Sequence, residues 1–117
     1  MRDFNYGLNL DKLKVSDKER EDFAKANHEQ YKFVFEQMVH MGIQSRYSGG
    51  IGGSKQRVFG RILDKLDLAE TLIIKLEETE YEFLKEILND ENSKFASQNT
   101  RLIMQYRQAL EDAKVIE

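Results

Sequence analysis

The sequence contains no cysteine and no proline. The lack of cysteine excludes disulfide bonds, thiolate zinc sites and cysteine nucleophiles. Proline is the residue that interrupts helices most strongly, so its absence leaves only glycine and asparagine to end them. A proline-free chain that is also rich in glutamate and lysine is predicted to be mainly helical.

Long hydrophobic segments are also missing. No uninterrupted apolar run is longer than that of Leu72–Ile74, whereas a membrane span needs about 20 apolar residues. Residues 1–15 mix charged and apolar side chains, so we expect neither a signal peptide nor a membrane segment, and the predicted location is the cytoplasm. With 117 residues, 40% of them apolar and 33% charged, the chain is expected to fold as one domain over residues 1–117.

Charge is unevenly distributed. Residues 37–63 contain no acidic side chain, whereas residues 77–91 are strongly acidic and contain the single cation Lys85. Such segregation favours a specific electrostatic partner, or pairing within or between copies of the chain. The basic interval carries Arg46, Lys55, Arg57 and Arg61.

Four helices are predicted from capping signals and apolar spacing. The first begins at Asp17 after the capping box Ser16–Glu19, and Gly42 is expected to end it in the left-handed conformation. Ser54 is expected to cap the second helix, inside which Gly60 suggests a close helix crossing. The predicted helices cover residues 17–41, 55–66, 77–88 and 97–114.

The fold class is therefore predicted to be all-α, a small four-helix domain with a glycine-rich loop over residues 43–54. Residues 1–15 are interpreted as an ordered N-terminal arm that lies across the body and is not helical. Residues 72–76 are short and β-branched enough to be one buried extended segment, although a helix has the same apolar spacing at that length.

The predicted core collects apolar residues that recur on one face of each helix. Its members are Phe23, Val34, Met38, Phe59, Ile62, Leu66, Leu84, Ile87, Leu102, Ile103, Tyr106 and Leu110.

Phe33 does not fit this inward stripe, because it projects about 100° away from Val34 on a helix of 3.6 residues per turn. Two interpretations remain open. Either the N-terminal arm buries Phe33, which is the favoured interpretation, or Phe33 belongs to a surface that another copy or a partner covers.

The sequence SGGIGGSK forms the centre of the glycine-rich loop. Its backbone amides precede a helix, a position that suits phosphate or another anion. The loop lacks the specific signatures, however, because Ser54 separates Gly53 from Lys55, unlike the Gly-Lys-Ser/Thr of a P-loop. A flexible connector that a partner orders on binding is the favoured interpretation. The candidate binding residues are Arg46, Tyr47, Gly49, Gly50, Ile51, Gly52, Gly53, Ser54, Lys55, Arg57, Arg61 and Phe33.

Two charged rows are spaced by four residues. The basic row is Arg57, Arg61 and Lys65, and the acidic row has the same spacing at residues 78, 82 and 86. Like charges at this spacing destabilise a helix, so the two rows are predicted to pair across a helical hairpin or between protomers, unless both are solvated.

No catalytic apparatus is visible. His28 and His40 lie about 120° apart around one helix and cannot share a metal from that helix alone. No serine or threonine sits in a nucleophile elbow, and no carboxylate pair has apolar neighbours that would raise a pKa. The chain is therefore predicted not to be an enzyme and to use neither metal nor cofactor.

The C-terminal half resembles small accessory proteins of tailed phages and prophages. The resemblance rests on the helical stretch Arg57–Leu66, on the segment Ile74–Leu84 and on the final acidic-alanine turn Ala109–Ala113. It implies a short chain that acts by stoichiometric binding, for instance as an inhibitor of a host or defence component, in the host cytoplasm.

The sequence thus predicts a non-catalytic, oligomeric binding protein that acts by contact with a protein partner, either a host protein or a second copy of the chain. The alternative is a binder of a phosphate-containing ligand, a nucleotide or nucleic acid, that uses the SGGIGGSK loop and the basic face of the following helix.

Overall fold

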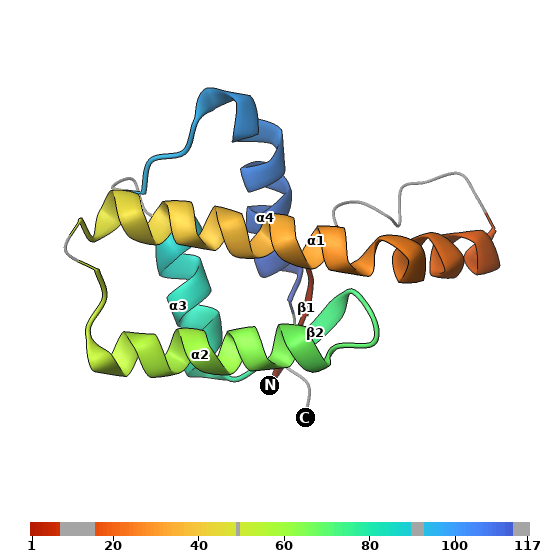
Figure 1. Cartoon of the computed structure of the whole chain (residues 1–117), viewed down its shortest axis with the longest axis horizontal. Helices are drawn as coiled ribbons and strands as arrows, with labels where there is room; N and C mark the ends of the chain where they lie inside the picture. The colour runs from red at the N-terminus through yellow and green to blue at the C-terminus, as the bar shows by residue number, and fades with distance from the viewer. Residues whose placement is uncertain (8–15, 49, 90–92, 114–117) are drawn as a thin grey trace.

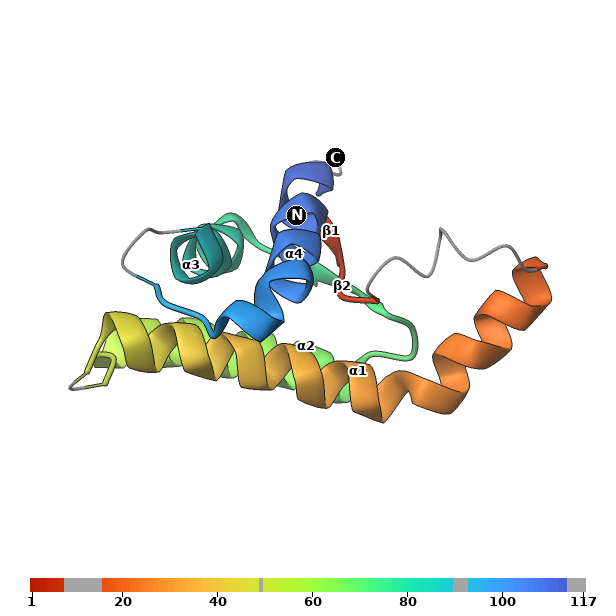
Figure 2. The same ribbon diagram turned by 90° about the horizontal axis from the view of Figure 1, so that it is seen from above.

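The computed structural model describes residues 1–7, 16–48, 50–89 and 93–113. Over these residues the chain is mainly helical, with four helices and a small two-stranded antiparallel sheet. Figures 1 and 2 show two layers: α1 and α2 lie side by side, and α3, α4 and the sheet cover one side of them.

The first helix, α1, spans Asp17–Arg46. It begins where the capping box predicts, because the Ser16 side chain accepts a hydrogen bond from the Glu19 amide at 3.2 Å. The predicted end at Gly42 is wrong, since the helix continues to Arg46 and Gly42 is one of its buried residues. The connection to α2 is therefore residues 47–52, shorter than the predicted loop of 43–54.

Gly42 marks a close helix crossing. A Cβ atom at this position would lie 2.6 Å from Cγ2 of Ile87 in α3 and 3.0 Å from the ring of Phe95. Gly60, for which the sequence suggested such a crossing, has open space around it. The helix that approaches α3 closely at a glycine is therefore α1, at Gly42, and not α2, at Gly60.

Strands β1 (Arg2–Asn5) and β2 (Ile73–Leu76) pair antiparallel, with Phe4 opposite Ile74. The extended interpretation of residues 72–76 is thus confirmed. The sequence did not predict that the start of the N-terminal arm is the partner strand. The described part of the arm, residues 1–7, is not helical, and Phe4 and Tyr6 are fully buried. Residues 8–15 of the predicted arm lie outside the described residues.

The remaining helices agree with the prediction to within a few residues. Helix α2 spans Gly53–Leu68, with Gly52 rather than Ser54 at the N-cap position. Helix α3 spans Glu78–Asn89, and α4 spans Thr100–Asp112 after a short 3₁₀ turn, Ser97–Asn99.

Most of the predicted core is buried. Phe23 is the clear error, because 43% of its surface is exposed. The first turns of α1 extend beyond the body (Figure 1). Val34 and Leu102 are half-buried. The confirmed core residues are Met38, Phe59, Ile62, Leu66, Leu84, Ile87, Ile103, Tyr106 and Leu110. The sheet adds Phe4, Ile74 and Leu76 to the core, which the helical pattern alone did not reveal.

Candidate functional site

Glu86 on α3 is the centre of a cluster that joins α3 to both ends of the glycine-rich region. Arg46, the last residue of α1, donates to its carboxylate at 3.0 Å, and Lys55 in the first turn of α2 donates at 2.9 Å. The Tyr47 hydroxyl donates to the same carboxylate at 2.5 Å. The hydrogen bonds from Tyr47 and Lys55 lower the pKa of Glu86 despite its partial burial.

Glu80 forms a second cluster at the start of α3. Its carboxylate is fully buried and accepts from Lys65, from Arg61 at 3.3 Å and from the Glu77 amide at 3.0 Å. Burial by itself would raise the pKa of Glu80, but these three donors outweigh it, and the pKa is lowered.

These clusters revise the predicted pairing of the two charged rows. Arg61 and Lys65 pair with Glu80, which is not in the acidic row at all. Within that row, Glu86 pairs with Arg46 and Lys55, and Glu78 pairs with Arg2 at 2.7 Å. Opposite charges do join α2 to α3. The spacing of the charged rows alone, however, did not predict which residues pair.

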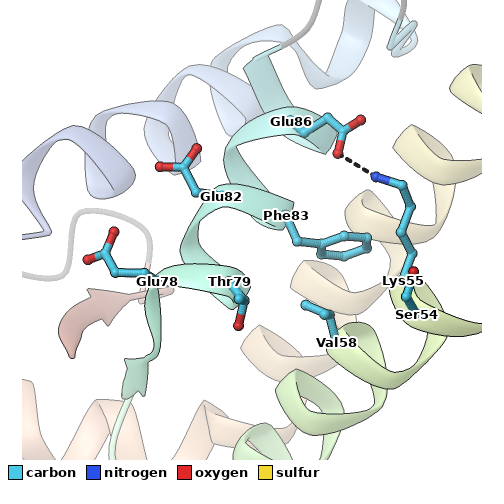
Figure 3. Close-up of a pocket in the computed structure, with 8 residues that line it drawn as sticks. All are labelled: Ser54, Lys55, Val58, Glu78, Thr79, Glu82, Phe83 and Glu86. Atoms are coloured by element: carbon cyan, nitrogen blue, oxygen red, sulfur yellow. Dashed lines mark hydrogen bonds and ion pairs between the residues drawn. The ribbon is translucent and has the colours of Figure 1, made fainter.

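An open groove of about 590 Å³ lies between α2 and α3 (Figure 3). Val58 and Phe83 form its apolar centre, and the Lys55–Glu86 ion pair borders it at one end. Figure 3 shows that Glu82 projects from the side of α3 opposite to Phe83 and Lys55. Of the predicted binding residues, Ser54 and Lys55 line this groove.

Gly50 and Gly52 of the SGGIGGSK loop precede α2, and Gly53 is its first residue. Gly50 has a φ of +90° and donates its amide to the Tyr47 carbonyl at 2.8 Å. Gly52 and Gly53 have no atom within 4 Å of where a Cβ would lie. Ile51 is half-buried against the core, and Gly49 lies outside the described residues. The structure therefore brings Arg46, Tyr47 and Lys55 together at Glu86, whereas Arg57 is exposed on α2 and makes no ion pair within the described chain.

Phe33 lies on a different surface, the outer face of α1. Its side chain is 60% exposed, so the favoured interpretation, burial by the N-terminal arm, is wrong. We define the outer face of α1 by residues that follow one another at intervals of three and four, all exposed and none charged. They are Phe23, Ala26, Gln30, Phe33, Gln37, Met41 and Gln44.

The sequence contains the signal for this face, but Phe23, one of its members, was predicted to belong to the core. The buried side of α1 is instead formed by Phe35, Met38, Val39 and Ile43, all in its C-terminal half. Residues 17–34 of α1 contain no buried residue. Among the described residues, this half is held by partly buried contacts only: Ala24 and Tyr31 pack against the core, and Lys32 pairs with Asp67 at 3.0 Å.

The histidines serve in packing. His28 contacts the Tyr6 hydroxyl through Nε2 at 2.9 Å, and the ring of His40 packs edge-on against Phe59. No group of three acidic or histidine side chains suited to a metal occurs among the described residues. In the same part of the chain, no helix has both the length and the low charge that crossing a bilayer requires.

Comparison with known protein families, curated proteins and solved structures finds no match for this chain.

Proposed function

We propose that this chain is a non-catalytic binding protein that acts by stoichiometric contact with another protein, through the outer face of α1. The observation that carries the proposal is the set of seven exposed, uncharged side chains on one face of a long helix. Alternation of three and four residues is the spacing by which one helix packs along another.

The need of the N-terminal half of α1 for tertiary packing also supports a protein partner at this face. An isolated helical segment of about 15 residues is marginal in water, so helices normally depend on tertiary packing. The N-terminal half of α1 has no buried residue, yet it presents Phe23 and Phe33 to solvent. A hollow of about 200 Å³ beside Phe23, lined also by Gln30 and Val34, could receive a side chain of the partner.

A second copy of the chain is the partner that we expect first. The chain carries a net charge of −3, and two copies that met through like-charged faces would repel each other. The outer face of α1 carries no charge, so it can meet its own copy without bringing like charges together. The resemblance of the C-terminal half to phage accessory proteins adds a host or defence protein as the further partner proposed here.

A phosphate ligand at the SGGIGGSK loop has less support. Of the cations proposed for it, Lys55 and Arg61 already pair with the carboxylates of Glu86 and Glu80, and only Arg57 makes no ion pair among the described residues. A phosphate would have to replace those ion pairs.

The test compares Phe33→Ser with the matched control Leu68→Ser, since Leu68 is 82% exposed at the end of α2 and is not a member of the outer face of α1. Sedimentation equilibrium over a range of concentrations is expected to show self-association of the natural chain and of Leu68→Ser. Phe33→Ser is expected to be monomeric with an unchanged melting temperature, because its side chain contributes little to the fold.

Pull-downs from host extract with the same three chains complete the test. A host partner is expected to be recovered in stoichiometric amount by the natural chain and by Leu68→Ser but not by Phe33→Ser. A chain that stays monomeric at high concentration and retains no partner that depends on Phe33 would overturn the proposal.

A further inference from the structure

A cavity of about 370 Å³ lies between the end of α3 and the first two turns of α4, apart from both surfaces described above. Its described lining includes the cations Lys94 and Arg107 and contains no carboxylate. Arg2, Lys55 and Lys65, by contrast, pair with glutamates.

Arg107 is held in a fixed orientation at this cavity. Its Nε donates to the Leu88 carbonyl at 2.6 Å. Neither Arg107 nor Lys94 makes an ion pair in the part of the chain that the structure describes. The terminal amino groups of the Arg107 guanidinium therefore remain available as a pair of parallel donors.

The segment that carries Lys94 is attached to α1. The Lys94 amide donates to Oγ of Ser45 at 2.7 Å, and Ser45 in turn donates to the Gly42 carbonyl at 3.1 Å. Phe95 packs against Gly42 so closely that a Cβ atom on the glycine would lie 3.0 Å from the phenylalanine ring. This wall of the cavity is thus positioned before any ligand binds.

Ser93 provides an independent indication of a ligand. It is only 6% exposed and lines the cavity, yet its Oγ has no hydrogen-bond partner among the described residues. A buried hydroxyl without a partner costs stability, and such groups usually have a bound water or ion as partner. An acceptor in this cavity would accept the hydrogen bond from Ser93.

We propose that this cavity binds a phosphate group, either as the free anion or as a phosphomonoester. Arg107 supplies two parallel donors, Lys94 a second positive charge and Ser93 a hydroxyl donor, which together match the oxygens of a phosphate dianion. Ile103 and Met104 give the cavity an apolar side that could contact the organic part of an ester. The site is independent of the proposed protein contact on α1.

The test is a titration of the ¹⁵N-labelled chain with sodium phosphate and, separately, with adenosine 5′-monophosphate at constant ionic strength. Saturable shifts are expected at the amides of Ser93, Lys94 and Arg107. Lys94→Gln is expected to weaken binding about tenfold, since a charge-assisted hydrogen bond is lost. Ser93→Ala is expected to weaken binding as well, without lowering the melting temperature, because it removes a hydroxyl that has no partner in the described fold.

Arg57→Gln is the matched control, since it removes the same charge from an exposed cation near the glycine-rich loop. It is expected to leave the affinity unchanged. Equal affinity for both probes would identify the free anion as the ligand, and tighter binding of the nucleotide would identify the ester. The proposal is overturned if neither probe saturates, if the shifts appear at residues 50–55 instead, or if Arg57→Gln weakens binding as much as Lys94→Gln.

Discussion

Glu80 illustrates how a single charged side chain can join several elements. Its buried carboxylate accepts from Arg61 and Lys65 on α2 and from the backbone at the start of α3. Lys65 also donates to the Lys75 carbonyl of β2 at 2.7 Å. Removing one partner of a buried ion pair leaves the other without compensation, which destabilises a protein far more than loss of an exposed pair.

Glu80→Gln is predicted to lower the free energy of unfolding by about 2 kcal/mol at neutral pH. Because the pKa of Glu80 is lowered in the folded chain, its contribution is present above the ordinary value of 4.5 and is lost as the pH falls below it. Urea unfolding between pH 7 and pH 3 should therefore show a shallower loss of stability in the variant. Glu82→Gln, at a carboxylate without an ion pair in the described chain, is the control and should keep the slope of the natural chain.

The two helical glycines, Gly42 and Gly60, predict opposite outcomes for the same substitution. Gly60→Ala is expected to stabilise the chain by about 0.5 to 1 kcal/mol, because alanine favours the helix and the space around this position is open. Gly42→Ala is expected to destabilise it by about 1 to 3 kcal/mol, since the new Cβ would meet Ile87 at 2.6 Å. Thermal unfolding of the two variants gives the signs, and a stabilised Gly42→Ala would contradict the close crossing.

At the scale of elements, the small sheet shows what local pattern cannot reveal. The apolar run at residues 72–76 is sufficient to suggest a strand, but a strand requires a partner, and its partner begins at residue 2. Phe4 and Tyr6 alternate toward the core, yet four paired residues are too few for alternation to stand out. Long-range pairing of this kind depends on the whole fold rather than on any window of sequence.

Phe4→Ala is predicted to cost about 3 to 5 kcal/mol, because Phe4 is fully buried and its ring packs against Phe35 with centroids 5.3 Å apart. Asp3→Ala, on the exposed side of the same strand, is expected to change stability by less than about 0.5 kcal/mol. Urea unfolding monitored by circular dichroism compares the two. A small loss for Phe4→Ala would mean that β1 is peripheral to the fold.

The helices were predictable from sequence where capping and apolar spacing agreed. Ser16 sets the start of α1, and the core residues of α2 to α4 recur at helical intervals. Phe23 was misassigned to the core because the N-terminal half of α1 has apolar side chains on an exposed face as well as on the side that faces the body. The charge clusters were predictable in kind, since a basic and an acidic interval do pair, but the choice of Glu80 over Glu82 depends on how α2 and α3 cross.

At the scale of the whole molecule, α1 has two halves with different support. Its buried residues all fall between Phe35 and Ile43, and the first turns of the helix extend away from the body (Figure 2). Local stability follows burial, so the two halves of one continuous helix should open independently.

Hydrogen exchange is predicted to show this difference. In dilute solution the amides of residues 21–33 should exchange much faster than those of residues 36–45, because the former segment contains no buried residue. At high concentration, protection should increase over residues 23–33 if the outer face of α1 is covered by a second copy. Uniformly slow exchange along α1 at every concentration would show that the N-terminal half needs no partner.

The pairing of β1 with β2 also orders events during synthesis. Chains are made at roughly 5 to 20 residues per second, and β2 lies nearly 70 residues after β1. For several seconds, therefore, Phe4 and Tyr6 have been made while the strand that will cover them has not. Strand β1 can therefore pair only after β2 has been synthesised. Any nascent chain that stops before Leu72 would carry these two aromatic residues without their strand partner.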